Sequence, residues 1–104
     1  EVEIIRGYPV TYNDPELTRQ MMPSVVQAAG EDNVHLVRAV TGAEDFSFYA
    51  QKAPGLFLFL GGMPPGTENP APHHTPDFYV DDTGMKLGVR TLCYLTVDYM
   101  DASN

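Results

Sequence analysis

The pattern of apolar and polar positions predicts three strands. Acidic and aliphatic residues alternate over residues 1–6, which is typical of a half-buried strand, and Gly7 and Pro9 follow it. Residues 33–40 are short and rich in β-branched side chains, which favours a second strand. Residues 55–61 are apolar between two glycines, as expected of a strand that is covered on both faces.

The same pattern predicts a helix that begins at Pro15. Asn13 or Asp14 can cap its start, and Gly30 ends it. Pro23 predicts a kink or a break. Apolar positions recur at steps of three and four residues and form one inward stripe, which consists of Leu17, Met21, Val25 and Ala28 or Ala29.

Two further helices are predicted. Residues 44–51 form a short one that buries Phe46 and either Tyr49 or Phe48. Asp81 or Asp82 can cap a last helix that continues to about residue 98, in which glycines at 84 and 88 weaken the helix or allow close packing. The expected inward stripe of this helix is Met85, Val89, Leu92 or Cys93, Thr96 and Tyr99. The alternation of elements indicates an α/β fold, a layered sheet with helices outside.

Composition narrows the possible functions. The chain has 104 residues, of which 43% are hydrophobic, and this fits one globular domain or a piece of one. Its net charge of −8 argues against binding nucleic acid or an anionic membrane surface. Cys93 is the single cysteine, and no apolar run approaches the roughly 20 residues that span a bilayer. A reducing, cytoplasmic setting is therefore expected.

The candidate chemistry lies in the Gly- and Pro-rich segment 62–76, where His73 and His74 are adjacent and prolines restrict the loop. Imidazole is the commonest protein ligand for metals. Two histidines alone do not make a zinc site, which takes three or four protein ligands, and the chain adds only His35 and Cys93 as soft donors. Both lie in apolar patterns typical of core or strand-surface residues. The alternative is a solvent-exposed loop in which a histidine caps the next helix.

Glu44 and Asp45 follow a Thr-Gly turn and are a second candidate. A carboxylate there can accept backbone hydrogen bonds, orient a ligand histidine or contact a metal. The other interpretation is an acidic residue that complements the helix dipole.

Several segments in order resemble the C-terminal part of the zinc amidohydrolases, the group of aminoacylases, hippurate hydrolases and indoleacetyl-amino-acid hydrolases. These segments are Gly7-Tyr-Pro-Val-Thr-Tyr-Asn13, Thr41-Gly-Ala-Glu-Asp-Phe-Ser-Phe-Tyr49, Pro54-Gly-Leu-Phe-Leu-Phe-Leu-Gly-Gly62 and His73-His-Thr-Pro-Asp-Phe78. The resemblance implies the C-terminal part of a three-layer α/β/α catalytic domain over residues 8–104, preceded over residues 1–7 by the last strand of a lid domain used in dimerisation. One departure is Asp81-Asp82, where family members often have glutamate second.

The resemblance also implies site residues. His74 matches a ligand of a two-metal centre, which holds zinc or, as alternatives, manganese or cobalt. His73 is then its neighbour, and Glu44 and Asp45 have a supporting or substrate-side role. The remaining ligands and the catalytic glutamate of the family lie upstream, so we expect a fragment with no catalytic residue of its own.

The expected reaction of the intact enzyme is hydrolysis of the amide bond of an N-acyl amino acid or peptide. The isolated chain is expected to be inactive, and to form a homo-oligomer or need the missing N-terminal part. Two alternatives remain open. One is a non-enzymatic α/β binding or assembly module with the His loop as surface, and the other is a mononuclear zinc protein that uses His74, His35 and an acid.

Overall fold

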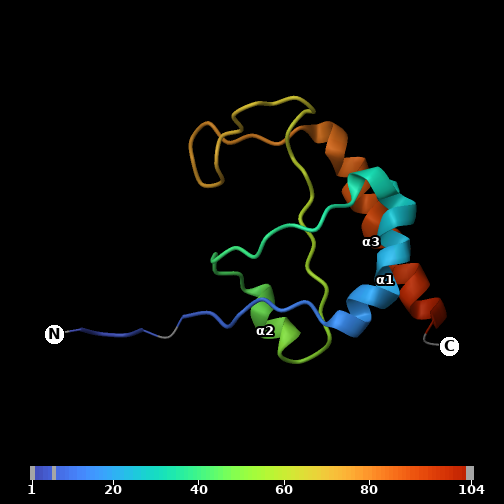
Figure 1. Cartoon of the computed structure of the whole chain (residues 1–104), viewed down its shortest axis with the longest axis horizontal. Helices are drawn as coiled ribbons and strands as arrows, with labels where there is room; N and C mark the ends of the chain where they lie inside the picture. Colours follow the sequence, from blue (N-terminus) through green and yellow to red (C-terminus); the bar gives the residue numbers. More distant parts are fainter. Residues whose placement is uncertain (1, 6, 103–104) are drawn as a thin grey trace.

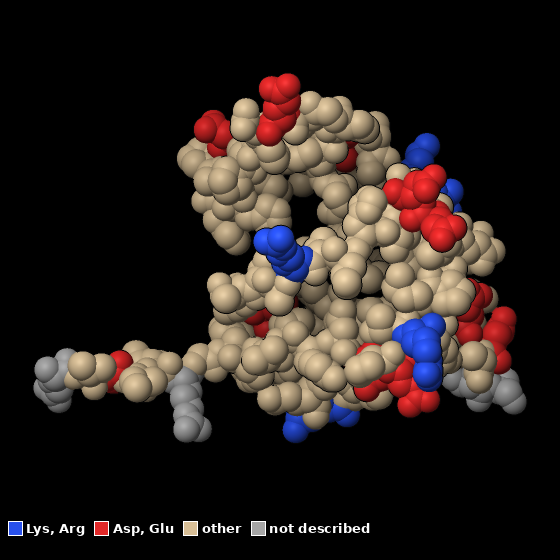
Figure 2. Space-filling view, in the orientation of Figure 1, with Lys and Arg blue, Asp and Glu red and all other residues tan. Residues whose placement is uncertain are grey.

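The computed structural model describes residues 2–5 and 7–102, and three α-helices and two short 3-10 helices account for its regular structure in that range. They are α1 Pro15–Ala29, η1 Glu31–Asn33, α2 Phe46–Ala50, η2 Asp82–Gly84 and α3 Met85–Ala102. Helices α1 and α3 lie side by side, and long coil segments connect them to α2 (Figure 1). The segment between residue 62 and α3 forms a separate lobe, with an opening between it and the part that contains α2 (Figure 2).

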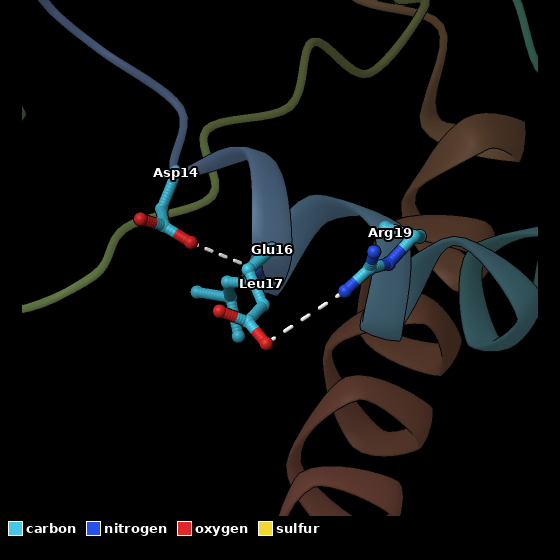
Figure 3. A network of polar contacts seen from close by, with 4 residues as sticks. All are labelled: Asp14, Glu16, Leu17 and Arg19. Carbon is cyan, nitrogen blue, oxygen red and sulfur yellow. Dashed lines mark hydrogen bonds and ion pairs between the residues drawn. The ribbon is translucent and has the colours of Figure 1, made fainter.

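Helix α1 begins as the sequence predicts. Asp14 is its N-cap, and the Asp14 carboxylate accepts a hydrogen bond from the Leu17 N–H at 2.8 Å (Figure 3). Glu16 and Arg19 form an ion pair at 3.7 Å, but both side chains are largely exposed, so this pair contributes little to stability. Gly30 ends the helix with φ +84°, a left-handed value that glycine adopts without strain.

The break predicted at Pro23 does not occur, because α1 is continuous from Pro15 to Ala29. Pro23 lies on the exposed face of the helix. There, water can bond the carbonyl group that has lost its helical N–H donor, which lowers the cost of the proline.

The core is small and lies between α1 and α3. Of the predicted stripe of α1, Met21, Val25 and Ala28 are buried, as expected, and Leu17 is half-buried. The predicted stripe of α3 is wrong: Met85, Leu92 and the other residues of that set are exposed. A different face of α3 is half-buried, and it consists of Leu87, Gly88, Thr91, Tyr94, Leu95 and Asp98.

Helix α2 is confirmed as a short helix, but its burial differs from the prediction. Ser47 is fully buried, whereas Tyr49 and Phe48 are exposed. Phe46 is half-buried, and its ring lies 5.3 Å from the ring of Phe57.

The predicted α/β fold is wrong for the described residues, which form helices and coil and no strand. Residues 2–5 and 34–40 are mostly exposed coil, and residues 55–61 are coil as well; Glu1 and Arg6 of the first predicted strand lie outside the described residues. The physical reason is that a strand exists only through hydrogen bonds to a neighbouring strand, and none of the described segments pairs with these three.

Side-chain and single backbone contacts hold the apolar segment 55–62 instead. The Asn13 amide donates to the Phe57 carbonyl oxygen at 2.9 Å and accepts from the Phe57 N–H at 2.7 Å. Next to it, the Asp14 N–H donates to the Gly55 carbonyl oxygen at 2.9 Å. The segment is therefore attached at this end to the start of α1. None of the helices within residues 2–5 and 7–102 combines the length and the hydrophobicity that a membrane span requires.

Candidate functional site

The His loop, residues 62–81, is closed at its base. The Asp81 N–H donates to the Gly62 carbonyl oxygen at 2.7 Å, which joins the first and last residues of the loop. Val80 packs beside Gly62, since a Cβ atom placed on Gly62 would lie 3.5 Å from the Val80 Cγ1 atom. Figure 1 shows this loop in yellow and orange, extending away from the helices.

The base of the loop also packs tightly against the start of α3. A Cβ atom on Gly84 would lie 3.2 Å from the Gly61 carbonyl oxygen, and one on Gly88 would lie 2.9 Å from the Leu60 Cδ2 atom. Both distances are shorter than ordinary van der Waals contact. A larger residue at 84 would press on the backbone at Gly61, whereas one at 88 would require the Leu60 side chain to move. The sequence suggested that Gly84 and Gly88 either weaken the helix or allow close packing, and the structure shows close packing at both.

His74 has a left-handed backbone, with φ +64°, and among the described residues no other non-glycine residue has a positive φ. This conformation costs an L-residue roughly 1–2 kcal/mol. Turn contacts on both sides hold it: the Thr75 hydroxyl donates to the Pro72 carbonyl oxygen at 2.8 Å, and the Phe78 N–H donates to the Thr75 carbonyl oxygen at 3.1 Å. The His74 side chain is exposed.

The two imidazoles have different surroundings. The His73 ring packs edge-on against Phe78, with ring centroids 4.8 Å apart, and the His73 and His74 centroids are 6.3 Å apart. His73 therefore has an aromatic packing partner within the loop.

A cavity of about 480 Å³ lies inside the loop, next to His73. Its main walls are Leu60, Met63, Pro72, His73, Phe78 and Val80. The sequence did not single out Met63 or Phe78 as site residues. The signal for them was the long Gly- and Pro-rich loop itself, in which large apolar side chains have no helix or strand to pack into.

Glu44 and Asp45 lie at the start of α2, away from the His loop (Figure 1). Glu44 Oε1 accepts a hydrogen bond from the Phe46 N–H at 3.3 Å, and the Glu44 carbonyl oxygen accepts from the Ser47 hydroxyl at 2.6 Å. Asp45 is exposed, and its side chain makes no capping hydrogen bond. The Glu44 contacts match the helix-start interpretation, in which the acid satisfies free N–H groups.

The described residues alone do not assemble a metal centre, because no three of their His, Cys, Asp and Glu side chains lie close enough to hold one ion. His35 and Cys93 were expected in the core or on the surface of a strand, but both are exposed, His35 in coil and Cys93 in α3. The mononuclear alternative with His74, His35 and an acid is therefore not formed in this part of the chain. The described residues offer isolated donors, of which His73 and His74 lie in the constrained His loop.

Asp81 fixes the end of the loop. Its carboxylate accepts from the Thr83 hydroxyl at 2.6 Å and from the Thr83 N–H at 3.1 Å. Asp81, one of the two residues expected to cap the last helix, thus caps η2, which leads directly into α3. Two hydrogen bonds lower the pKa of Asp81 from its usual value of 3.8: the one from the Thr83 hydroxyl has the larger effect, and the one from the Thr83 N–H has the smaller effect.

Sequence comparison identifies the class of protein. Residues 1–98 match the profile of "Peptidase family M20/M25/M40", and the chain belongs to this family. This confirms the resemblance that the His73-His-Thr-Pro-Asp-Phe78 and neighbouring segments indicated.

Particular relatives are similar over most of the chain. Thermostable carboxypeptidase 2 of Saccharolobus solfataricus is 36% identical over 88% of this chain and 23% of its own length. The uncharacterized hydrolase y4tI of Sinorhizobium fredii is 38% identical over 79% of this chain and 20% of its own length. The IAA-amino acid hydrolase ILR1-like 2 of Arabidopsis thaliana is 29% identical over 88% of this chain and 21% of its own length. The chain thus spans about a quarter or less of these relatives. No solved structure matches it.

Proposed function

We propose that the intact protein is a metal-dependent amidohydrolase that cleaves the amide bond of N-acyl amino acids or peptides, and that this chain supplies one wall of its site. The proposal is supported by membership of the peptidase family and by the carboxypeptidase and the IAA-amino acid hydrolase among its relatives. The family is generally metal-dependent. By analogy with the zinc amidohydrolases the ions are two, with zinc as the first candidate and manganese or cobalt as alternatives.

The observation that favours His74 as the metal ligand is its strained backbone. Strained residues persist where the surrounding structure enforces them, and they concentrate at functional sites. The hydrogen bonds of Thr75 and Phe78 enforce the left-handed turn at His74 and leave its imidazole exposed. His73, which packs on Phe78, is proposed as a neighbour that supports the loop.

The other proposed roles are supporting ones. Glu44 and Asp45 would hold the start of α2 on the substrate side of the site, through hydrogen bonds such as that from the Phe46 N–H to Glu44. Bound metal ions supply polarisation of the scissile carbonyl and a water of lowered pKa. The further metal ligands and the general base would come from residues beyond these 104.

The test is to replace each histidine in the intact enzyme and to count bound metal by elemental analysis. His74→Ala should lose one equivalent of metal and most of its activity, because removing one ligand weakens a converged set. His73→Ala serves as the matched control and should keep its metal with a milder loss of activity. Full metal content in His74→Ala, or equal losses in both variants, would show that the assignment is wrong.

We also infer that the chain needs further residues of its own protein, or another copy of itself, to cover its apolar surface. Large apolar side chains such as Ile4, Leu36 and Val89 are 87%, 103% and 64% exposed. Light scattering on the purified 104-residue chain should detect association, because exposed apolar surface of this kind promotes it. A stable monomer would refute this inference.

A further inference from the structure

The cavity inside the His loop differs in chemistry from the surface around it. Its walls include no Asp, Glu, Lys or Arg, and His73 is their single titratable side chain. Acidic side chains appear on the outer edge of the same lobe (Figure 2). The cavity is open to solvent on one side, and a charged group placed in it would find no partner of opposite charge on its walls. The cavity is therefore suited to an uncharged, apolar group.

The size and stiffness of the cavity fit a small ligand group. Its volume of about 480 Å³ lies within the range of roughly 300–1,000 Å³ that is usual for ligand pockets. Pro70 and Pro72 stiffen one wall by fixing their own φ angles. The hydrogen bond between Asp81 and Gly62 holds the base closed. A preformed wall of this kind lowers the ordering cost of binding.

Two side chains give the cavity a preference for aromatic or bulky apolar groups. Phe78 presents an aromatic ring to the cavity, and aromatic rings pair favourably with other rings. Met63 adds a flexible thioether that adapts to irregular shapes and makes favourable contacts with aromatic edges.

The position of the cavity relates it to the proposed metal ligand. His73 is part of the cavity wall, and its ring lies 6.3 Å from that of His74. If the scissile amide of a substrate lies at His74, the group next to that bond is therefore within reach of the cavity. Both the acyl group and the amino-acid side chain are attached in this way.

We propose that this cavity is a specificity pocket that binds an uncharged apolar group of the amide substrate, with Met63 and Phe78 as the residues that select it. The proposal rests on the proposed function for its substrate class. The pocket can receive the acyl group or the amino-acid side chain, and the experiment separates these two sources.

The kinetic test uses the intact enzyme and the variant Met63→Trp, which fills the cavity. N-benzoylglycine tests the acyl group, N-acetylphenylalanine tests the side chain, and N-acetylglycine is the small reference. For at least one of the two bulky substrates kcat/KM should fall about tenfold or more through a higher KM, while N-acetylglycine changes less than about twofold. The substrate that loses rate identifies the source. Unchanged rates, or equal losses for all three substrates, would overturn the proposal.

The matched control is Leu92→Trp. Leu92 lines a second apolar groove of about 410 Å³ between α1 and the end of α3, and it is not part of the cavity in the His loop. This variant should not alter the ratio of bulky to small substrate. The same selectivity change in Leu92→Trp would overturn the proposal.

If the enzyme cleaves none of these substrates, that result counts against the proposed function and not against the pocket. A binding measurement then tests the pocket by itself. The intact protein with ¹³C-labelled methionine methyl groups is titrated with benzamide and with acetamide. Benzamide should shift the Met63 methyl signal, acetamide should shift it much less, and the Met100 signal in the other groove should stay constant. An unchanged Met63 signal would overturn the pocket whatever the enzyme cleaves.

Discussion

Replacement of Asn13 by alanine should loosen the apolar segment 55–62. The variant loses the hydrogen bond from the Asn13 amide to the Phe57 carbonyl oxygen, at 2.9 Å, and the one from the Phe57 N–H to the Asn13 side chain, at 2.7 Å. A hydrogen bond contributes a net 0.5–1.5 kcal/mol on average, so the pair is worth about 1–3 kcal/mol. Alanine at position 13 offers neither a donor nor an acceptor to replace them.

The measurement is hydrogen exchange of the Phe57 amide in the intact protein, since exchange reports the free energy of local opening. A loss of about 1–3 kcal/mol corresponds to roughly 5- to 150-fold faster exchange at Phe57. Gln27→Ala is the control, because Gln27 is exposed on α1 and its replacement should change stability by less than about 0.5 kcal/mol. Unchanged exchange at Phe57 in the Asn13 variant, or the same acceleration in the Gln27 variant, would refute the reasoning.

Three further changes test the support of the loop and the core. Thr83→Val should raise the pKa of Asp81 toward 3.8, because the hydrogen bond from the Thr83 hydroxyl is lost. An NMR titration of the Asp81 carboxyl carbon measures this pKa. Because the folded pKa of Asp81 is lowered, its stabilisation is present above the unfolded pKa and is lost as pH falls through the folded one, and the variant should show less of this pH dependence. Gly84→Ala should speed exchange of the Asp81 amide, because the new methyl group would lie 3.2 Å from the Gly61 carbonyl oxygen; an unchanged rate would show that the contact relaxes. Met21→Ala should cost about 2–5 kcal/mol in urea unfolding, since Met21 is only 4% exposed, and a much smaller loss would mean that the site collapses around the cavity.

Helix α1 could be predicted because its signals are local. The Asp14 cap, Pro15 at the first helical position and Gly30 after the last one each act within one turn of the chain. The stripe that includes Met21 and Val25 has regular helical spacing, and its burial agrees with that spacing.

The strands could not be predicted correctly, because pairing depends on another segment. The Gly55 to Gly61 sequence is apolar enough for a covered strand, but its backbone meets a side-chain amide, that of Asn13, at Phe57. Propensity describes how well residues fit a sheet and does not supply the neighbouring strand. The expectation of a layered sheet therefore failed over the described residues.

The inward face of α3 was ambiguous for a different reason. Apolar residues occur on more than one side of this helix, so a stripe through Val89 and Leu92 and another through Leu87 and Leu95 both have helical spacing. In the structure Gly88 lies on the half-buried face, where a Cβ atom would meet the Leu60 Cδ2 atom at 2.9 Å. A sequence pattern does not contain this information about the facing segment.

At the candidate site, the motif at residues 73–78 indicated His74, but the cavity beside it depended on contacts across the loop. Met63 and Phe78 are far apart in sequence and line the same cavity. They come together because the Asp81 N–H bonds the Gly62 carbonyl oxygen.

The apolar segment 55–62 is the common support of both family motifs. Phe57 packs against Phe46 of α2, which follows the Glu44-Asp45 pair, with ring centroids 5.3 Å apart. At its other end, Gly62 bonds Asp81 and closes the loop that holds the histidines. A displacement of this segment therefore acts on the two motifs together, although they lie apart in the fold. For this reason a substitution at Asn13, distant in sequence from both motifs, should affect the proposed site through position and not through chemistry.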